Sequence, residues 1–236
     1  DFSLNKLNRQ KWLTVNLKGN YMPDKHIVDR YRDTVDLFDV DDDGKGLDFF
    51  IPPKEEVEPS TLPAAFQHGF YALTVGAGHY TKQMSAEDLV KLITLIDRPV
   101  VLLGSQSESA KAQKIKQALP DKAMNACGTF NLNQSASVVK QARFVISHDT
   151  GMMHIAAALK KNIISLWGNT IPAFGMYPYR PGPLSEMMEV KDLYCRPCSK
   201  IGYSKCPKKH FRCMKDLDKP YIDQKAKEMW NAAGPE

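Results

Sequence analysis

The stretch that decides the fold is FVISHDTGMMHIAAALKKNIISLWGNT, from Phe144 to Thr170. It opens with an apolar run, Phe144–Ser147, of the kind found in buried strands. Small and apolar residues then predict a helix over Gly151–Lys160, and a second apolar run over Asn162–Trp167 predicts another strand. Both strands are apolar without alternation, which indicates a βαβ unit of a parallel sheet that is covered on both faces.

The same alternation extends upstream. Three more strands are predicted, at Tyr71–Val75, at Pro99–Leu103 and, more weakly, at Ala123–Ala126. The helices between them are expected to begin after a Ser85 N-cap and to cover Ser107–Leu119 and Asn133–Ala142. Five strands alternating with helices over about a hundred residues predict an α/β fold with a Rossmann-like parallel sheet.

The chain before Tyr71 has a different character. Residues 1–50 contain one expected helix, His26–Phe38, and residues 51–70 are rich in Pro and Glu and indicate a linker. We therefore divide the chain into a short first region, a linker, and a main domain over residues 71–236.

The net charge of +5 is unevenly distributed among the 236 residues. Residues 195–215 hold seven Lys or Arg and no Asp or Glu, whereas the rest holds 25 basic and 27 acidic residues. This basic segment is either a solvated loop or a surface for a phosphate-bearing or membrane-surface partner. No nucleic-acid-binding motif accompanies it. No run is long enough for a membrane span and no signal peptide is visible, so the expected location is the cytoplasm.

Four of the five cysteines lie inside the basic segment, in the spacing Cys195-x2-Cys198-x7-Cys206-x6-Cys213. A cytoplasmic setting makes zinc possible and disulfides uncommon. The spacing is not a standard zinc pattern. Buried thiols are therefore favoured over a structural zinc ion, with disulfides as the third alternative.

The segment Ser147–His154 is the centre of the candidate site, because it joins a strand to a helix N-terminus. Unpaired N–H groups and the positive end of the helix dipole suit a diphosphate, and Gly151 allows close backbone approach. Asp149, Thr150 and His154 can face the same ligand. The alternative is a helix capped by Asp149 or Thr150, with a structural His154.

Three further loops follow strands and are expected at the same carboxyl edge of the sheet. Gly76–Met84 offers glycines and Lys82 for a phosphate, Gly104–Glu108 offers Glu108 for a ribose hydroxyl, and Gly168–Tyr179 offers Thr170 for a phosphate. Each has a purely structural alternative as a turn or a helix cap. Trp167 and Tyr177 are candidates for stacking on a base, although Trp167 also fits a core position.

The sequence DTGMMHIAAALKKNIISLWGNTIP, from Asp149 to Pro172, resembles glycosyltransferase family 9, the ADP-heptose:lipopolysaccharide heptosyltransferases. The Asp-Thr-Gly, the His three residues later and the Gly-x-Thr-x-Pro all match the family pattern. Trp167-Gly168-Asn169 stands where the family often has Phe-Gly-Pro. CRPCSKIGYSKCPKKHFRCMKDL is similar to the Cys-rich tail of many members.

The resemblance implies a GT-B arrangement of two Rossmann-like domains, of which this chain carries the C-terminal, donor-binding half. Residues 1–50 would then be the remnant of the acceptor-side domain, and the Asp that acts as general base has no matching position here. The implied reaction is inverting transfer of a heptose from an ADP-sugar to the lipopolysaccharide core, without a required cofactor or metal. The implied donor-binding residues are Lys82, Glu108, Asp149, Thr150, Gly151, His154 and Thr170.

By the same resemblance, we expect this chain to bind donor with weak or no transfer, in the cytoplasm and peripheral to the inner membrane. Two other functions remain open. One is a nucleotide-sugar epimerase, which needs a carboxylate pair facing the sugar. The other is a non-catalytic nucleotide-binding module with a Cys-rich structural site.

Overall fold

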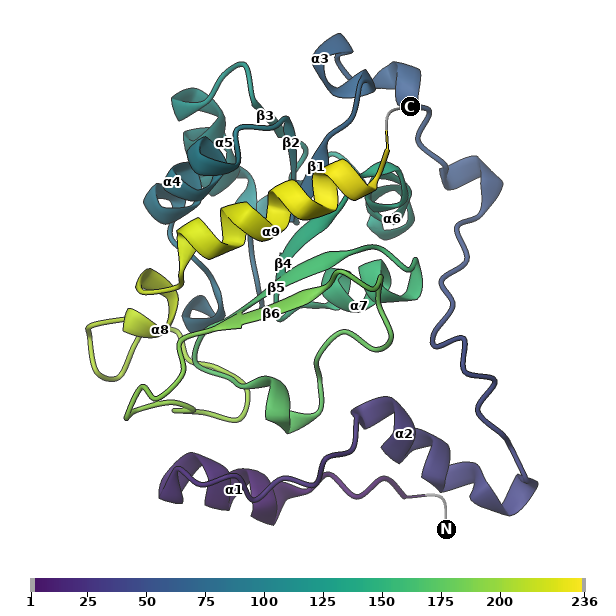
Figure 1. The fold of residues 1–236 in the computed structure, drawn as a ribbon, viewed down its shortest axis with the longest axis vertical. Coiled ribbons are helices and arrows are strands. Elements are labelled where there is room, and N and C mark those ends of the chain that lie inside the picture. Colours follow the sequence, from purple (N-terminus) through teal and green to yellow (C-terminus); the bar gives the residue numbers. More distant parts are fainter. Residues whose placement is uncertain (1–2, 235–236) are drawn as a thin grey trace.

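The computed structural model describes residues 3–234 and is built on a parallel sheet (Figure 1). The strand order is β3-β2-β1-β4-β5-β6, and every neighbouring pair is parallel. The first five strands confirm the predicted ones: β1 (Tyr71–Thr74), β2 (Val100–Leu103), β3 (Ala123–Asn125), β4 (Val145–His148) and β5 (Ile163–Trp167). The order reverses between β1 and β4, which places a ligand crevice beyond the carboxyl ends of these two strands.

The sixth strand, β6 (Glu186–Glu189), was not predicted. It pairs with β5 from Ile164↔Glu186 to Trp167↔Glu189 and forms one edge of the sheet. Its sequence is Glu-Met-Met-Glu, and only Met188 is buried. An edge strand with charged ends gives no apolar run to detect, which explains the omission.

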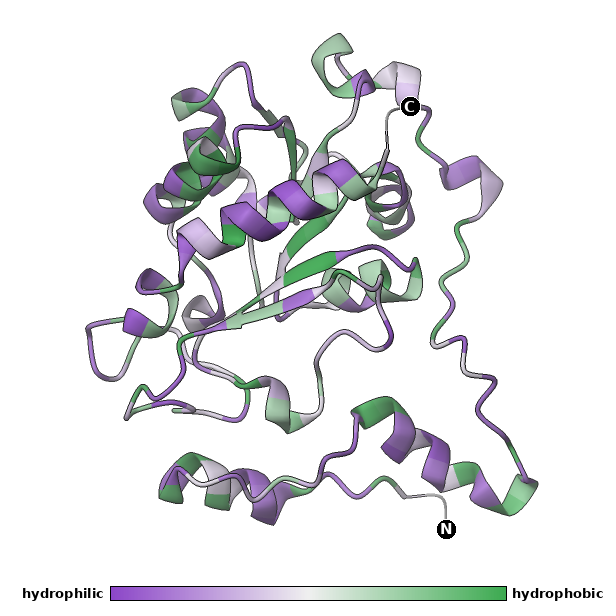
Figure 2. Cartoon of the chain, in the orientation of Figure 1, coloured by the Kyte–Doolittle hydropathy of each residue, from purple (hydrophilic) through white to green (hydrophobic). Residues whose placement is uncertain are grey.

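Helices cover both faces of the sheet (Figure 1). Tyr71 and Leu73 of β1 face a core formed with α4 (Ala86–Ile96), α5 (Ser109–Ala118) and α9 (Lys219–Ala232). Ala72 faces the opposite core, formed with α6 (Leu132–Gln141) and α7 (Gly151–Ala158). Figure 2 shows apolar residues along β4 and β5 and polar residues on the outer side of α9. The two-faced burial explains why the central strands read as continuous apolar runs.

The predicted helices are confirmed with small shifts at their ends. Ser85 caps α4 by accepting a hydrogen bond from the Asp88 N–H, as expected. A capping box of Ser105 and Glu108 precedes α5, through the short 3₁₀ helix η5 (Gln106–Glu108). The helix predicted over His26–Phe38 is α2 (Ile27–Arg32) followed by a 3₁₀ helix, η1 (Asp33–Phe38).

The N-terminal segment, residues 3–50, lies along the loops that follow β5 and β6 (Figure 1). It contains α1 (Asn8–Leu17), α2 and η1. The Ile27 N–H donates to the Gly175 carbonyl at 2.8 Å, and the Tyr179 hydroxyl donates to Asp29 at 2.6 Å. A small apolar cluster of Leu7, Met22 and Phe174 lies between them. Polar contacts therefore provide much of the attachment of this segment.

Residues 51–70 cross to the sheet as extended chain with short helical turns, η2 (Pro53–Glu55), η3 (Pro59–Thr61) and α3 (Ala64–Gln67). Leu62, Phe66 and Phe70 are buried in the core beside α6 and α7. The second half of this stretch is thus packed against the main domain. At the other end of the chain, α8 (Arg212–Lys215) is a single turn. Within residues 3–234, no helix combines the length and apolar character that crossing a membrane requires.

Candidate functional site

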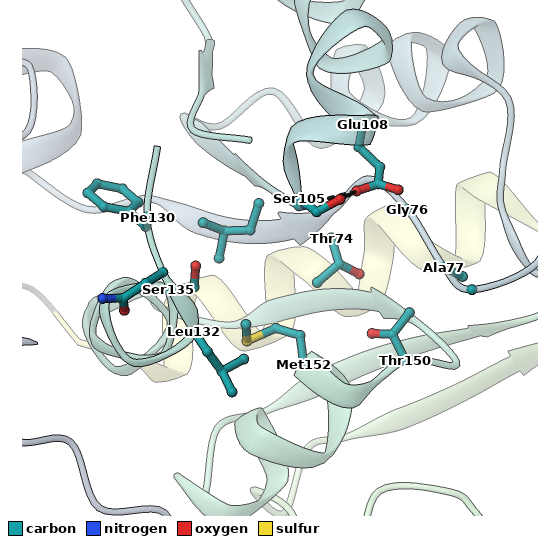
Figure 3. Close-up of a pocket in the computed structure, with 14 residues that line it drawn as sticks. Thr74, Gly76, Ala77, Ser105, Glu108, Phe130, Leu132, Ser135, Thr150 and Met152 are labelled. Carbon is teal, nitrogen blue, oxygen red and sulfur yellow. Dashed lines mark hydrogen bonds between the residues drawn. The ribbon is translucent and has the colours of Figure 1, made fainter. Parts of the chain in front are cut away.

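A pocket of about 460 Å³ opens at the carboxyl ends of β1, β2 and β4. Figure 3 shows Glu108 on one side of it, Phe130 and Ser135 on another, and Thr150 and Met152 at the N-terminal end of α7. The volume lies within the ordinary range for small-molecule sites, and apolar walls with few polar groups are typical of them. The complete lining is Thr74, Gly76, Ala77, Gly78, Leu103, Gly104, Ser105, Glu108, Phe130, Asn131, Leu132, Ser135, Thr150 and Met152.

Glu108 caps a helix and also lines the pocket. Its carboxylate accepts hydrogen bonds from the Ser105 N–H at 2.8 Å and from the Ser107 hydroxyl at 2.8 Å, so it caps the helix. Burial opposes ionisation, but the hydrogen bonds from Ser105 and Ser107 outweigh it and the pKa of Glu108 lies below its usual value. The side chain is also part of the pocket wall, so a fixed, ionised carboxylate is presented to a ligand.

The glycine at position 76 is required by this arrangement. A Cβ there would collide with the Glu108 side chain. Lys111 fixes the rest of the loop, because its ammonium donates to the Val75 carbonyl at 3.0 Å and to the Met84 carbonyl at 2.6 Å. Burial lowers the pKa of Lys111 to about 8. Lys111 was not singled out from the sequence, where it is one of several lysines in its helix.

Lys82, Asp149 and Thr170 are brought together beside the pocket. Lys82 lies in the 3₁₀ helix η4 (Tyr80–Lys82), and its Nζ is 2.6 Å from Asp149 Oδ2. The Thr170 hydroxyl donates to the same oxygen at 3.0 Å. The two charged side chains are 16% and 10% exposed, so the pair is mostly shielded from solvent. Three loops that are distant in sequence thus meet at one polar cluster.

The N-terminus of α7 lies next to this cluster. Thr150 is the N-cap residue, but its side chain makes no capping hydrogen bond. No side chain therefore caps the helix, in contrast to the structural alternative considered above. A Cβ placed on Gly151 would meet no atom within 4 Å, so this helix end faces open space. Exposed N–H groups at a helix N-terminus are a ready anion site.

His154 lies on the first turn of α7 and His148 at the end of β4. Burial lowers the pKa of His154, with Asp149 opposing and Lys82 reinforcing the shift. His148 is fully buried, and its Nε2 accepts a hydrogen bond from the Met84 N–H at 2.9 Å. Burial lowers the pKa of His148 to about 3, so the ring is neutral and joins β4 to the end of the Lys82 loop.

Trp167 is a core residue and not a stacking platform. It is 1% exposed, and its indole N–H donates to Ser165 at 3.0 Å. Tyr177 packs edge-on against His26, with ring centroids 4.7 Å apart. Neither residue lines the 460 Å³ pocket.

Sequence reasoning missed one wall of the pocket, which is formed by Phe130, Asn131, Leu132 and Ser135. The signal was present: these residues follow the third strand, whose carboxyl end lies at the same sheet edge as the others. It also missed Arg196, whose guanidinium donates to the Gly168 and Thr170 carbonyls at 2.6 and 2.8 Å and pairs with Glu189. Arg196 braces the loop that carries Thr170.

The four cysteines of the basic segment are free thiols. Cys195 and Cys213 are buried, and burial raises the pKa of Cys213 to about 12. Cys195 Sγ lies 3.6 Å from His210 Nε2. Within residues 3–234, no group of three or more His, Cys, Asp or Glu side chains is arranged to hold a metal ion.

The chain matches the family model of glycosyltransferase family 9 (heptosyltransferase) over residues 3–208. A lipooligosaccharide heptosyltransferase 2 of Haemophilus influenzae is 32% identical over 100 residues, which make up 41% of this chain and 27% of that protein. The matched region therefore spans about a quarter of this relative's length.

Two solved structures share the fold. A glycosyl transferase family 9 structure from Veillonella parvula has a TM-score of 0.70 at 18% identity, covering 89% of this chain and 61% of that one. TibC of enterotoxigenic E. coli, an iron-containing dodecameric heptosyltransferase solved with ADP-D-β-D-heptose, has a TM-score of 0.52 at 12% identity, covering 76% and 49%. They confirm the expected α/β fold of GT-B heptosyltransferases.

Proposed function

This chain belongs to glycosyltransferase family 9, and on that premise we propose that its crevice binds an ADP-sugar, with a heptose as the transferred group. The observation that carries the proposal is the position of the pocket. It lies at the reversal point of the sheet, with Glu108 on its wall and an uncapped helix N-terminus at its rim. Nucleotides bind at this point in open parallel sheets.

Each part of the donor has a matching group. The apolar wall that includes Phe130 and Met152 suits the adenine, and the Glu108 carboxylate suits the ribose hydroxyls. Lys82, Thr150, Thr170 and the first N–H groups of α7, from Gly151 onward, suit the diphosphate. Asp149, which binds both Lys82 and Thr170, and His154, which is within electrostatic reach of Asp149, are assigned to the sugar or to the shape of the loop.

In the reaction, the departing diphosphate develops negative charge. The Lys82 ammonium and the α7 dipole lie in fixed positions beside the proposed diphosphate site, so they stabilise that charge without a metal ion. The acceptor is proposed to be the lipopolysaccharide core: one of its hydroxyl groups attacks the anomeric carbon of the donor sugar with inversion, the bond from that carbon to the diphosphate breaks, and ADP leaves. The basic segment 195–215 is proposed to bring the protein to the cytoplasmic side of the inner membrane, because six of its seven Lys and Arg side chains are exposed.

The general base is not assigned to a residue of this chain. Two carboxylates lie at the site within the described residues, and both are engaged. Glu108 is held by Ser105 and Ser107, and Asp149 by Lys82 and Thr170. The same arrangement disfavours an epimerase, which needs a carboxylate pair directed at the sugar. We therefore expect the chain alone to bind donor with weak or no transfer, and robust turnover would contradict this.

No cofactor is assigned, and the four cysteines are proposed to be structural thiols. The non-catalytic alternative, a nucleotide-binding module with a Cys-rich structural site, makes a different prediction. It requires that one metal ion, held by the four cysteines, co-purifies with each molecule of protein. It also requires that a transfer assay detects no activity. Metal analysis by mass spectrometry together with that assay separates the two.

The test of the donor site is titration of ADP by calorimetry into the wild type and Lys82→Ala. Loss of a charge-assisted hydrogen bond corresponds to roughly a tenfold or greater loss of affinity. Lys91→Ala is the matched control, because Lys91 is exposed on α4. The double variant Lys82→Ala/Asp149→Asn removes the carboxylate left unpaired by the first change. Equal ADP affinity in the wild type and both Lys82 variants would reject the assignment.

A further inference from the structure

A second pocket, of about 520 Å³, lies where the N-terminal segment meets the loops after β5 and β6 (Figure 1). One wall is formed within residues 14–20, at the end of α1 and the turn that follows it. The opposite wall combines the loop after β5 with residues 189–197. Lys18 joins the two walls, because its ammonium donates to the Pro197 carbonyl at 2.7 Å and to the Cys195 carbonyl at 3.3 Å. This contact holds the walls at a fixed separation.

The wall of the second pocket offers both hydrogen-bond acceptors and donors. Glu189 and Asp192 supply carboxylates, and one Glu189 oxygen lies 2.7 Å from Arg196. Lys191 supplies an ammonium and Asn20 an amide. Lys191 and Asp192 are exposed, and within residues 3–234 neither side chain forms an ion pair or a hydrogen bond. Their polar atoms are therefore available to a ligand.

Tyr194 adds an aromatic ring to the same wall. Its side chain is 66% exposed, and its ring is tilted by 53° against that of His210, with the centroids 6.1 Å apart. This contact leaves most of the tyrosine ring open to solvent. An exposed ring beside unpaired polar groups offers a ligand an apolar platform together with hydrogen-bond partners.

We infer that the second pocket binds a saccharide. A sugar ring carries hydroxyl groups, each of which donates and accepts, and its C–H groups form an apolar face that packs against an aromatic ring. The wall matches both properties. Its charge does not favour a simple anion, because two carboxylates lie among its three cations, Lys18, Lys191 and Arg196, and Arg196 is already paired. The volume lies within the ordinary range for small-molecule sites.

The second pocket adjoins the polar cluster of the proposed donor site. Ile171 belongs to its wall and directly follows Thr170, whose hydroxyl donates to Asp149. Arg196 also belongs to the wall and donates to the Thr170 carbonyl at 2.8 Å. A saccharide held here therefore lies next to the loop that contacts the donor, where the assembled part of a sugar acceptor is needed. This link to the acceptor rests on the proposed function, whereas the saccharide site itself does not.

The experiment follows the backbone amide resonances of the ¹⁵N-labelled chain during titration with dephosphorylated core oligosaccharide, released from lipopolysaccharide by mild acid. Maltotriose and sodium phosphate are titrated in parallel, as an unrelated saccharide and as a simple anion. Tyr194→Ala removes the ring, Tyr194→Phe keeps it, and Lys191→Ala removes a donor from the same wall. Tyr31→Ala is the matched control, because Tyr31 is an exposed tyrosine of α2 outside the pocket wall.

We expect saturable shifts of the Lys191, Asp192 and Tyr194 amides with the core oligosaccharide and none with phosphate. The affinity should fall at least about threefold in Tyr194→Ala and in Lys191→Ala, and it should be retained in Tyr194→Phe and Tyr31→Ala. The inference is overturned if the wild-type shifts do not saturate, if phosphate alone reproduces them, or if the affinity is the same in the wild type and both test variants. Should Tyr194→Ala not fold, the wild-type shifts and Lys191→Ala decide.

Equal binding of maltotriose would support the saccharide site and reject its assignment to the acceptor. ADP is titrated into the same samples, and unchanged ADP affinity in Tyr194→Ala keeps the two sites separate. Failure of the wild type to bind ADP rejects the proposed function and leaves the oligosaccharide result to decide the second pocket.

Discussion

Different forces stabilise the two regions of the molecule, the main domain that begins at Tyr71 and the N-terminal segment before residue 51. The main domain has two apolar cores, in which whole strands are inaccessible to solvent. The N-terminal segment contributes Leu7 and Met22 to a small apolar cluster with Phe174 and leaves Trp12 and Phe50 61% and 85% exposed. Hydrophobic burial scales with area removed from water, so the first region is stabilised by packing and the second by individual polar contacts.

The largest expected effect is on the free energy of unfolding, which should respond differently to a substitution in each of the two regions. Ile146 is fully buried in β4, so Ile146→Ala should lower the free energy of unfolding by about 3 kcal/mol through lost burial and the remaining cavity. Trp12→Ala removes a larger side chain from an exposed position and should change it by less than about 0.5 kcal/mol. Urea unfolding measures both. Comparable losses would show that the N-terminal segment is packed as tightly as the main domain.

A smaller effect tests whether polar contacts matter within the main domain. Lys111→Met removes the donor to the Val75 and Met84 carbonyls. It should lower the free energy of unfolding by about 2 kcal/mol. It should also weaken ADP binding, because the loop that carries Lys82 loses its brace. Lys114→Met, an exposed change on the same helix, is the control. Unchanged ADP affinity in Lys111→Met would exclude a positioning role.

The pH dependence of stability sharpens the comparison further. His148 has its pKa lowered to about 3 by burial, against about 6.5 when unfolded, so below pH 6.5 the unfolded chain binds a proton that the folded chain does not. The contribution is complete above the unfolded pKa and is lost as the pH falls, by about 1 kcal/mol between pH 7 and 5.5. His148→Gln should remove that part of the slope.

His26 and His154 also have pKa values lowered by burial and act with the same sign. The diagnostic quantity is therefore the difference in slope between the wild type and His148→Gln. Parallel stability curves for the two proteins would show that His148 is not the group responsible.

The smallest effect concerns the attachment of the N-terminal segment. Tyr179→Phe removes the hydroxyl that donates to Asp29. The lost hydrogen bond should lower the stability of this attachment by about 1 kcal/mol. The loss should be local, with faster amide exchange in α2 and unchanged exchange in β4. Tyr31→Phe, at an exposed position of α2, is the control. Faster exchange throughout the sheet would indicate that the segment and the main domain unfold as one unit.

The contrast between regions also explains what the sequence could predict. Strands β1, β2, β4 and β5 are buried along their whole length, so most of their residues are apolar, and the fold class could be predicted from them. Edge strand β6 was not predicted, because only one of its four residues is buried. A region whose structure depends on single polar contacts gives a weaker pattern, and of α2 and η1 only the helical character was predicted.

At the candidate site, the loops could be predicted from the sequence, but the contacts between them could not. Because parallel strands end at one edge, Glu108 and Thr150 were expected in one crevice, and the structure places both on the pocket wall. The ion pair of Lys82 with Asp149 was not predicted, since 67 positions separate the two residues and no local pattern records such a contact.

The Lys82–Asp149 pair has a consequence for the selectivity of the crevice. A free lysine side chain loses about 2 kcal/mol of rotamer entropy when it becomes fixed. Here that loss is incurred during folding, because Asp149 already holds the ammonium. A ligand therefore meets an ordered cation, but it must share that cation with a carboxylate. We therefore expect tighter binding of a ligand that carries several negative charges together with neutral hydroxyl donors. A simple monovalent anion should bind more weakly.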